Sequence, residues 1–223
     1  MKPRELLATA VVPGGEVLRL FRRGGDFMIM LGGNELMSSR MSGSEEALAV
    51  MTCARLGERP APHVLVGGYG MGFTLRAALQ MLPPRASVTV AELVPEIIGW
   101  ARGPMADVAA GCLDDPRVDV VEDDVAALIG RAHDAYDAIL LDVDNGPDGL
   151  TRCANDQLYS RSGLARAAIA LKPGGVLAIW SALADPAFTR RLRDSGFAVE
   201  EVEVRARSNG KGPRHTIWFA QRV

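Results

Sequence analysis

The sequence predicts an α/β fold in which seven strands form one mostly parallel sheet between two layers of helices. From residue 63 to residue 196, short apolar strand-like segments alternate with helical segments. The strand-like segments are apolar on both faces, which is typical of parallel strands covered by helices on each side. The last two strand-like segments follow each other without a helix, so they predict an antiparallel pair at one edge of the sheet.

The N-terminal residues 1–41 predict a small β-hairpin subdomain. Their strand-like pieces are short, and Gly-Gly pairs separate them, which favours tight turns between strands. These pieces are residues 16–23, 24–31 and 34–40. The remaining residues, 42–223, are expected to form one larger domain, because the regular alternation continues through them without a linker.

A helix is expected over residues 42–57, between a serine-rich start and Gly57. Ser42 or Ser44 is the expected N-cap. Glu45 and Glu46 either stabilise the positive end of the helix dipole or face a substrate, and the sequence leaves both interpretations open.

The regular part of the chain then supplies its elements in order. The expected strands share apolar, β-branched character, and they cover residues 63–68, 87–93, 117–124, 136–144, 176–182, 197–206 and 215–223. The expected helices share helical periodicity with Pro or Gly at their ends, and they cover residues 73–82, 95–105, 125–132, 160–172 and 185–196.

Composition excludes several function classes. The net charge is −2 and no Lys/Arg run is present, so a nucleic-acid partner is not expected. No apolar run reaches the ~18 residues that a membrane span needs, and no secretory leader is expected. Cys53, Cys112 and Cys153 are scattered without a CxxC motif, which predicts a reducing cytoplasm and neither disulfides nor zinc. No cluster has metal-ligand spacing, so no metal is expected.

Polar residues and glycines gather at the carboxyl ends of the expected strands, where open α/β sheets bind their ligands. The strands deliver Gly68 to Gly72, Glu92, Asp123, Asp124, Asp142, Asp144, Asn145 and Trp180. An aspartate after a strand can instead cap the next helix. Acids at the ends of three successive strands nevertheless favour a binding site.

The glycine loop has the spacing G-x-G-x-G over Gly68, Gly70 and Gly72. A dinucleotide fingerprint needs G-x-G-x-x-G, and Phe73 stands where its third glycine would fall. Glu92 follows about 20 residues later, where a ribose-binding acid is expected. The loop therefore predicts an adenosine ligand that lacks a pyrophosphate.

These residues resemble known families. The glycine loop, Glu92 and the Asp123–Asp124 pair resemble the cofactor site of class I S-adenosylmethionine-dependent methyltransferases, which have a Rossmann-like fold. The order VLVGGYGMGFTLRAAL, VAELVPEII, DPRVDVVEDD, YDAILLDVD and ALKPGG resembles the spermidine synthase (polyamine aminopropyltransferase) family over about residues 35–184.

The resemblance implies roles for individual residues. Glu92 would bind the ribose hydroxyls, Asp124 the adenine amino group, and Asp142, helped by Asp144, would orient and deprotonate an attacking amine. The implied cofactor-binding set is Gly68, Tyr69, Gly70, Gly72, Glu92, Leu93, Asp123, Asp124, Val125 and Asp142. Weaker substrate-binding candidates are Glu45, Glu46, Asn145, Trp180 and His215, the last in a loop that could cover the site.

Three departures from the family pattern affect its amine-recognising positions. We align the aspartate of the family's glycine loop with Gly70, its second catalytic-loop acid with Asn145, and its first-helix tyrosine near Glu45. With glycine at position 70, backbone N–H groups could approach the carboxylate of S-adenosylmethionine. We therefore expect S-adenosylmethionine as cofactor, S-adenosylhomocysteine as product, and methyl transfer to an amine or carboxylate of a small molecule or peptide.

Two alternatives stay open. The first is an aminopropyltransferase that uses decarboxylated S-adenosylmethionine, and the second is a non-catalytic nucleoside-binding protein. A homodimer is also expected, because members of the resembled family often pair through N-terminal elements.

Overall fold

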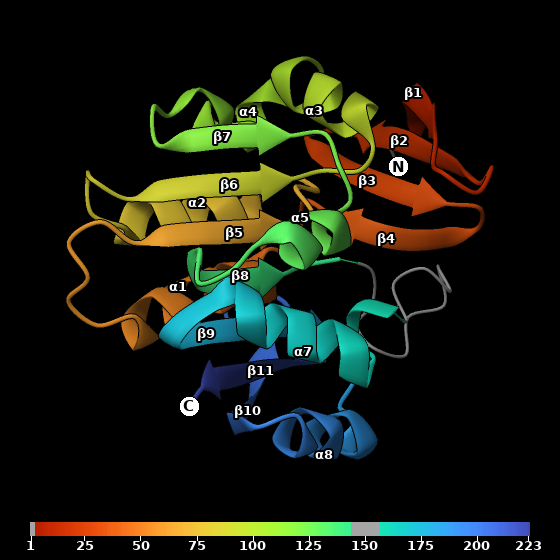
Figure 1. Ribbon diagram of the computed structural model, residues 1–223. Coiled ribbons are helices and arrows are strands. Elements are labelled where there is room, and N and C mark those ends of the chain that lie inside the picture. The colour runs from red at the N-terminus through yellow and green to blue at the C-terminus, as the bar shows by residue number, and fades with distance from the viewer. Residues whose placement is uncertain (1–2, 144–156) are drawn as a thin grey trace.

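The computed structural model describes residues 3–143 and 157–223, which form two sheets and their covering helices (Figure 1). The smaller sheet has four antiparallel strands in the order β1-β2-β3-β4. Its strands are β1 (Glu5–Val11), β2 (Val17–Arg23), β3 (Asp26–Leu31) and β4 (Asn34–Ser38). The sheet is an up-and-down meander, since each strand pairs with the next one in the chain.

Strand β1 was not expected from the sequence. Its residues ELLATAV are mostly exposed at the edge of the sheet, and Leu6 keeps 51% of its surface in contact with solvent. An edge strand that buries little shows no clean alternation of apolar and polar side chains, so the pattern that reveals strands is weak here. The division at residues 41 and 42 stays a prediction, with β4 ending at Ser38 and the next helix beginning at Gly43.

The larger sheet has seven strands in the order β10-β11-β9-β8-β5-β6-β7. Its strands are β5 (His63–Gly67), β6 (Ser87–Ala91), β7 (Val118–Val121), β8 (Tyr136–Leu141), β9 (Leu171–Ser181), β10 (Phe197–Arg205) and β11 (Arg214–Arg222). The first five are parallel, and β11 runs antiparallel to both β9 and β10. The predicted fold class, with its antiparallel last pair, is confirmed.

Helices cover both faces of this sheet because its strands alternate their side chains. Val64 and Val66 belong to the core shared with α1, α2, α3 and the smaller sheet, whereas Leu65 belongs to the core under α5, α7 and α8. The helices are α1 (Gly43–Arg55), α2 (Phe73–Met81), α3 (Pro95–Arg102), α4 (Ala106–Ala109), the 3-10 helix η1 (Cys112–Asp114), α5 (Val125–Arg131), α7 (Arg161–Ala170) and α8 (Pro186–Asp194). Among these described helices, none is long and apolar enough to span a bilayer.

The start of α1 differs from the expected serine cap. Ser42 occupies the N-cap position with helical backbone angles and makes no capping hydrogen bond. The Ser44 hydroxyl donates instead to the carboxylate of Glu45, at 2.6 Å. Glu45 is 6% exposed, so it is a buried acid and not a solvated helix-dipole residue.

The amino-terminal ends of the central strands are joined by a cluster of charges around Asp137. This residue, at the start of β8, is 3% exposed. Its carboxylate accepts hydrogen bonds from Lys172 Nζ at 2.7 Å, from the backbone N–H of His63 at 2.7 Å and from the Arg59 guanidinium. Burial alone would raise the pKa of Asp137, but these partners hold it below its ordinary value. The cluster links β5, β8 and β9 at the end of the sheet opposite to the carboxyl ends.

Candidate active site

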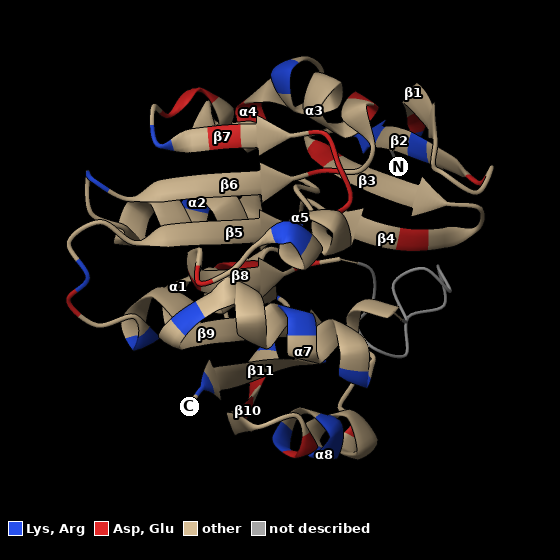
Figure 2. Cartoon of the chain, in the orientation of Figure 1, with Lys and Arg blue, Asp and Glu red and all other residues tan. Residues whose placement is uncertain are grey.

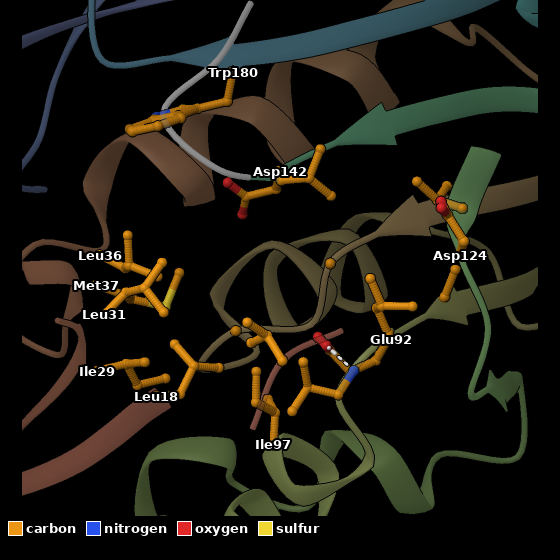
Figure 3. Close-up of a pocket in the computed structure, with 18 of the residues that line it drawn as sticks. Leu18, Ile29, Leu31, Leu36, Met37, Glu92, Ile97, Asp124, Asp142 and Trp180 are labelled. Carbon is orange, nitrogen blue, oxygen red and sulfur yellow. Dashed lines mark hydrogen bonds between the residues drawn. The ribbon is translucent and has the colours of Figure 1, made fainter. Parts of the chain in front are cut away.

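The strand order changes direction between β5 and β8, and a pocket lies there at the carboxyl ends of the strands. The chain proceeds from β5 to β6 and β7 on one side and returns to β8 and β9 on the other. Acidic residues follow β6 and β7 at the edge that faces the smaller sheet (Figure 2). The smaller sheet supplies the opposite wall of the pocket, so both sheets contribute side chains to it (Figure 3).

The glycine loop is held tightly against β8. The Gly68 N–H donates to the Ala91 carbonyl at 2.9 Å, and the Asp142 N–H donates to the Gly67 carbonyl at 3.0 Å. Gly68 has φ +84°, and a Cβ added there would lie 2.6 Å from the Asp142 carbonyl oxygen. Only glycine fits at this position.

Tyr69 and Gly72 support the loop and do not line the pocket. The Tyr69 ring is 3% exposed, and its hydroxyl lies 3.4 Å from the Cys112 sulfur inside the core. A Cβ added to Gly72, which has φ +80°, would lie 2.6 Å from that hydroxyl. Packing under the loop draws the Tyr69 ring inward, so the loop lines the pocket at Gly68 and Gly70 and not at this ring.

Glu92 is a buried carboxylate between two loops. Its Oε2 accepts the Tyr69 N–H and its Oε1 accepts the Val94 N–H, both at 2.9 Å. Burial raises its pKa. The backbone N–H groups of Tyr69, Val94, Gly70 and Leu93 lower that pKa as hydrogen-bond donors, and the Glu92 carboxylate also lines the pocket.

The two aspartates after β7 have local structural partners. The Asp124 carboxylate caps α5 by accepting the Ala126 N–H at 2.8 Å, and it also lines the pocket beside Leu93 and Val125. The Asp123 carboxylate accepts the Asp124 N–H at 2.8 Å and pairs with Arg131 at 3.1 Å. Asp124 therefore caps α5 and lies in the pocket wall, so its capping role does not exclude a role in binding.

Asp142 and Glu45 form a pair of acids in the pocket wall. The Thr74 hydroxyl donates to Asp142 Oδ2 at 2.6 Å and the Ser44 hydroxyl donates to Glu45 Oε2 at 2.6 Å. Burial raises the pKa of Asp142 to about 6. Burial and the charge of Asp142 raise the pKa of Glu45 to about 8. Near pH 7 the pair thus holds a proton, which a bound cation would displace.

His215 is connected to this pair through Ser44. Its Nδ1 lies 2.9 Å from the Ser44 Oγ, and its ring packs edge-on against Trp180 with centroids 4.8 Å apart. His215 lies at the start of β11, where the sequence placed the beginning of a strand over residues 215–223, and it is half-buried.

The titration of Glu45 gives a stability prediction. The pKa of Glu45 in the folded protein lies above the unfolded value of 4.5. Its contribution to the free energy of unfolding is therefore fully present at low pH and is lost as the pH rises through about 8. At about pH 9, Glu45→Gln should be more stable than the parent by about 2 kcal/mol, or roughly 5 °C in Tm, with little difference near pH 4.5. Thermal melts across pH test this. Glu46→Gln is the matched control, and parallel curves for the parent and Glu45→Gln would contradict the assignment.

The space above Gly70 is occupied by Met37 of β4. Gly70 has φ +56°, and a Cβ added there would lie 2.7 Å from the Met37 methyl carbon and 2.8 Å from its sulfur. A thioether side chain therefore covers the position where the sequence analysis expected room for a carboxylate.

Some candidates stay untested and some residues were missed. Asp144 and Asn145 lie outside the described residues, and Glu46 is half-buried beside Glu45 without lining the pocket. Ser44, Thr74 and Met37 were not proposed as site residues. Ser44 stands next to an expected site residue, whereas Met37 comes from the other sheet and no local signal marks it.

Comparison with known proteins identifies relatives. The model of the spermine/spermidine synthase domain family matches residues 45–191. A polyamine aminopropyltransferase of Mycobacterium tuberculosis is 34% identical over 192 residues, which cover 82% of this chain and 35% of that protein. Polyamine aminopropyltransferase 2 of Pseudomonas aeruginosa is 33% identical over 128 residues, or 55% of this chain and 34% of that protein. The chain thus matches about a third of the length of these relatives.

Solved structures share the fold. A spermidine synthase in complex with the transition-state analogue AdoDATO superimposes with a TM-score of 0.76 at 19% identity, over 98% of this chain and 73% of that one. The spermidine synthase from Thermotoga maritima gives 0.76 at 18% identity, with the same coverage.

Proposed function

The chain belongs to the spermine/spermidine synthase family, and from that premise we propose that it transfers an aminopropyl group from decarboxylated S-adenosylmethionine to an amine. The observation that carries the proposal is the acid pair of Glu45 and Asp142 in the pocket wall. Two carboxylates that hold a proton between them suit ligands that bring ammonium groups, because a cation allows both to ionise.

The expectation of methyl transfer from S-adenosylmethionine was wrong. The relatives that match are polyamine aminopropyltransferases, which agree with the alternative and not with the main expectation. The expectation depended on Gly70 as a place for the carboxylate of S-adenosylmethionine. The Met37 methyl group fills the space there, and a carboxylate against a methyl group loses hydration without gaining a partner.

The residues present fit the adenosine portion of the donor. The carboxylate of Glu92, which lines the pocket, suits the two ribose hydroxyls as a hydrogen-bond acceptor. The remaining oxygen of Asp124, whose Oδ1 caps α5, suits the adenine amino group, with Val125 beside the ring. We assign these roles, and that of the glycine loop, as part of the proposal.

The donor would supply a three-carbon chain activated by a positively charged sulfur. As the acceptor nitrogen forms its bond to carbon, the C–S bond breaks and its electron pair stays on sulfur, leaving 5′-methylthioadenosine. The proton of the nitrogen passes to Asp142, whose pKa of about 6 makes it ionised and basic near neutral pH. The Thr74 hydroxyl holds that carboxylate in place at 2.6 Å. Glu45 would bind the free ammonium of the aminopropyl chain.

A mass-spectrometric assay tests the proposal. The protein is incubated with a mixture of primary amines and either decarboxylated S-adenosylmethionine or S-adenosylmethionine. The expected result is one aminopropyl group added to an amine, with release of 5′-methylthioadenosine, only in the first reaction. Methyl transfer in the second reaction without aminopropyl transfer in the first would overturn the proposal. A cytoplasmic location and a homodimer stay predictions from the sequence.

A further inference from the structure

A chain of three polar side chains leads from the pocket wall to β11. Glu45, which lines the pocket, lies 2.6 Å from the Ser44 hydroxyl through its Oε2. The same hydroxyl lies 2.9 Å from Nδ1 of His215. Ser44 is fully buried and Glu45 is 6% exposed, so the middle of the chain is shielded from solvent. The protonation of Glu45 and that of His215 are therefore linked through a single hydroxyl group.

This chain has two consistent arrangements of its hydrogens, because a hydroxyl group both donates and accepts. In the first arrangement, protonated Glu45 donates to Ser44, and Ser44 donates to an unprotonated Nδ1 of His215. In the second arrangement, the Nδ1–H of His215 donates to Ser44, and Ser44 donates to the ionised Glu45. The distances of 2.6 and 2.9 Å suit hydrogen bonds in either direction.

One concerted shift of two protons converts the first arrangement into the second. The O–H bond of Glu45 breaks as its proton moves to the Ser44 oxygen, and the original Ser44 proton moves to Nδ1 of His215. The products are a carboxylate and an imidazolium, because Nε2 of His215 keeps its own proton. The shift needs no other reactant, and its charges balance within the chain.

The charges around Glu45 favour the first arrangement before a cation binds. Burial, the charge of Asp142 at the end of β8 and that of the neighbouring Glu46 raise the pKa of Glu45 to about 8. Burial lowers the pKa of His215. Near pH 7 the proton therefore stays on Glu45.

An ammonium group in the pocket reverses this preference. A cation within about 4–6 Å of a carboxyl group stabilises its ionised form. The ionised Glu45 in turn stabilises an imidazolium at the other end of the chain. The neighbours of His215 on β9 and β10 are Trp180 and Val204, and neither carries a charge that opposes the imidazolium.

We propose that His215 is a positioning residue that takes up the proton of Glu45 when the ammonium group of the donor binds. This inference rests on the proposed aminopropyl transfer and adds a residue to the donor site. His215 acts through Ser44 from behind the pocket wall, where its ring packs against Trp180. The shift lets Glu45 ionise without sending its proton past the bound donor.

Nitrogen-15 NMR of the histidine rings at pH 7 tests the proton shift directly. The His215 signals are identified among those of the three histidines by their loss in His215→Gln. We expect Nδ1 of His215 to be unprotonated in the protein alone and both ring nitrogens to be protonated with saturating decarboxylated S-adenosylmethionine. 5′-Methylthioadenosine has no ammonium group and should leave the ring neutral. A neutral His215 ring in the donor complex would overturn the inference and leave the proposed function intact.

The affinity for the donor gives a second test. The side chain of His215→Gln can donate to or accept from Ser44 but cannot take up a proton. By calorimetry, we expect this variant to bind decarboxylated S-adenosylmethionine about fivefold more weakly at pH 7. The loss should be less than about twofold at pH 9, where Glu45 has already lost its proton. An equal loss at both pH values would indicate a merely structural role and would overturn the inference.

Two further variants serve as controls. His133 is an exposed histidine beside Asp134, so His133→Gln should leave the affinity unchanged at both pH values. Ser44→Ala interrupts the chain, so adding His215→Gln to it should weaken binding by less than about twofold. Additive losses at pH 7 would show that His215 acts by another route and would overturn the inference. No aminopropyl transfer by the parent, together with no binding of the donor or of 5′-methylthioadenosine, would overturn the proposed function as well.

Discussion

Asp142→Asn is expected to reduce the turnover of aminopropyl transfer by about a thousandfold, because it removes the group that accepts the proton of the attacking amine. Asparagine has nearly the same shape, and its side-chain oxygen can still accept the Thr74 hydroxyl that now lies 2.6 Å from Asp142 Oδ2. The fold and the nucleoside site should therefore persist. Initial rates give the turnover, and calorimetry with 5′-methylthioadenosine gives the affinity, which should change less than threefold.

Asp119→Asn is a suitable control for this experiment. Asp119 is an exposed aspartate on β7, so the same chemical change there should alter neither rate nor affinity. Turnover within threefold of the parent for Asp142→Asn would show that the proton leaves by another route, with the half-buried His215 as the next group to replace.

Glu92→Ala is expected to weaken binding of 5′-methylthioadenosine by more than a hundredfold and to lower the unfolding free energy by about 2–4 kcal/mol. The affinity falls because both ribose hydroxyls lose a charged acceptor. The stability falls because the N–H groups of Tyr69 and Val94, which donate to Glu92 at 2.9 Å, lose their partner inside the protein. Calorimetry measures the first effect and urea denaturation the second.

Two companion variants separate these effects. Glu122→Ala removes an exposed acid that directly follows β7 at the same edge of the sheet. It should change neither the affinity for 5′-methylthioadenosine nor the unfolding free energy. Glu92→Gln keeps one acceptor oxygen, so its stability should lie between those of the parent and of Glu92→Ala. Nucleoside affinity within threefold of the parent in Glu92→Ala would contradict the ribose assignment.

The sequence predicted the parts of the site that local patterns determine. The apolar run before Gly68, the glycine spacing and the acids that follow β6 and β8 all lie next to an element whose type was predicted correctly. Parallel strands bring their carboxyl ends to one edge, so Glu92, Asp124 and Asp142 were predicted to share a pocket, and they do.

The remaining parts of the site depend on contacts between distant segments. Ser44 and His215 lie 171 positions apart and meet only because β11 pairs with β9 beside α1. Met37 reaches Gly70 from a separate sheet, and no periodicity within either segment indicates that contact. The preference for methyl transfer was wrong for this reason, since it treated Gly70 as open space without knowing which side chain lies over it.

The charge cluster around Asp137 has a mechanical consequence for the site. Asp137 lies in β8 and Asp142 directly follows that strand, roughly 17 Å away at the usual rise per residue. At the amino-terminal end of β8, Asp137 accepts hydrogen bonds from Lys172, Arg59 and the His63 backbone. At the carboxyl end, Asp142, the proposed base, lies next to the glycine loop. Loss of the partners of Asp137 would loosen the amino-terminal end of β8, whose carboxyl end positions the proposed base Asp142. We therefore expect substitutions at Lys172 or Arg59 to change the rate of the proposed transfer through the position of β8, although neither residue lines the pocket.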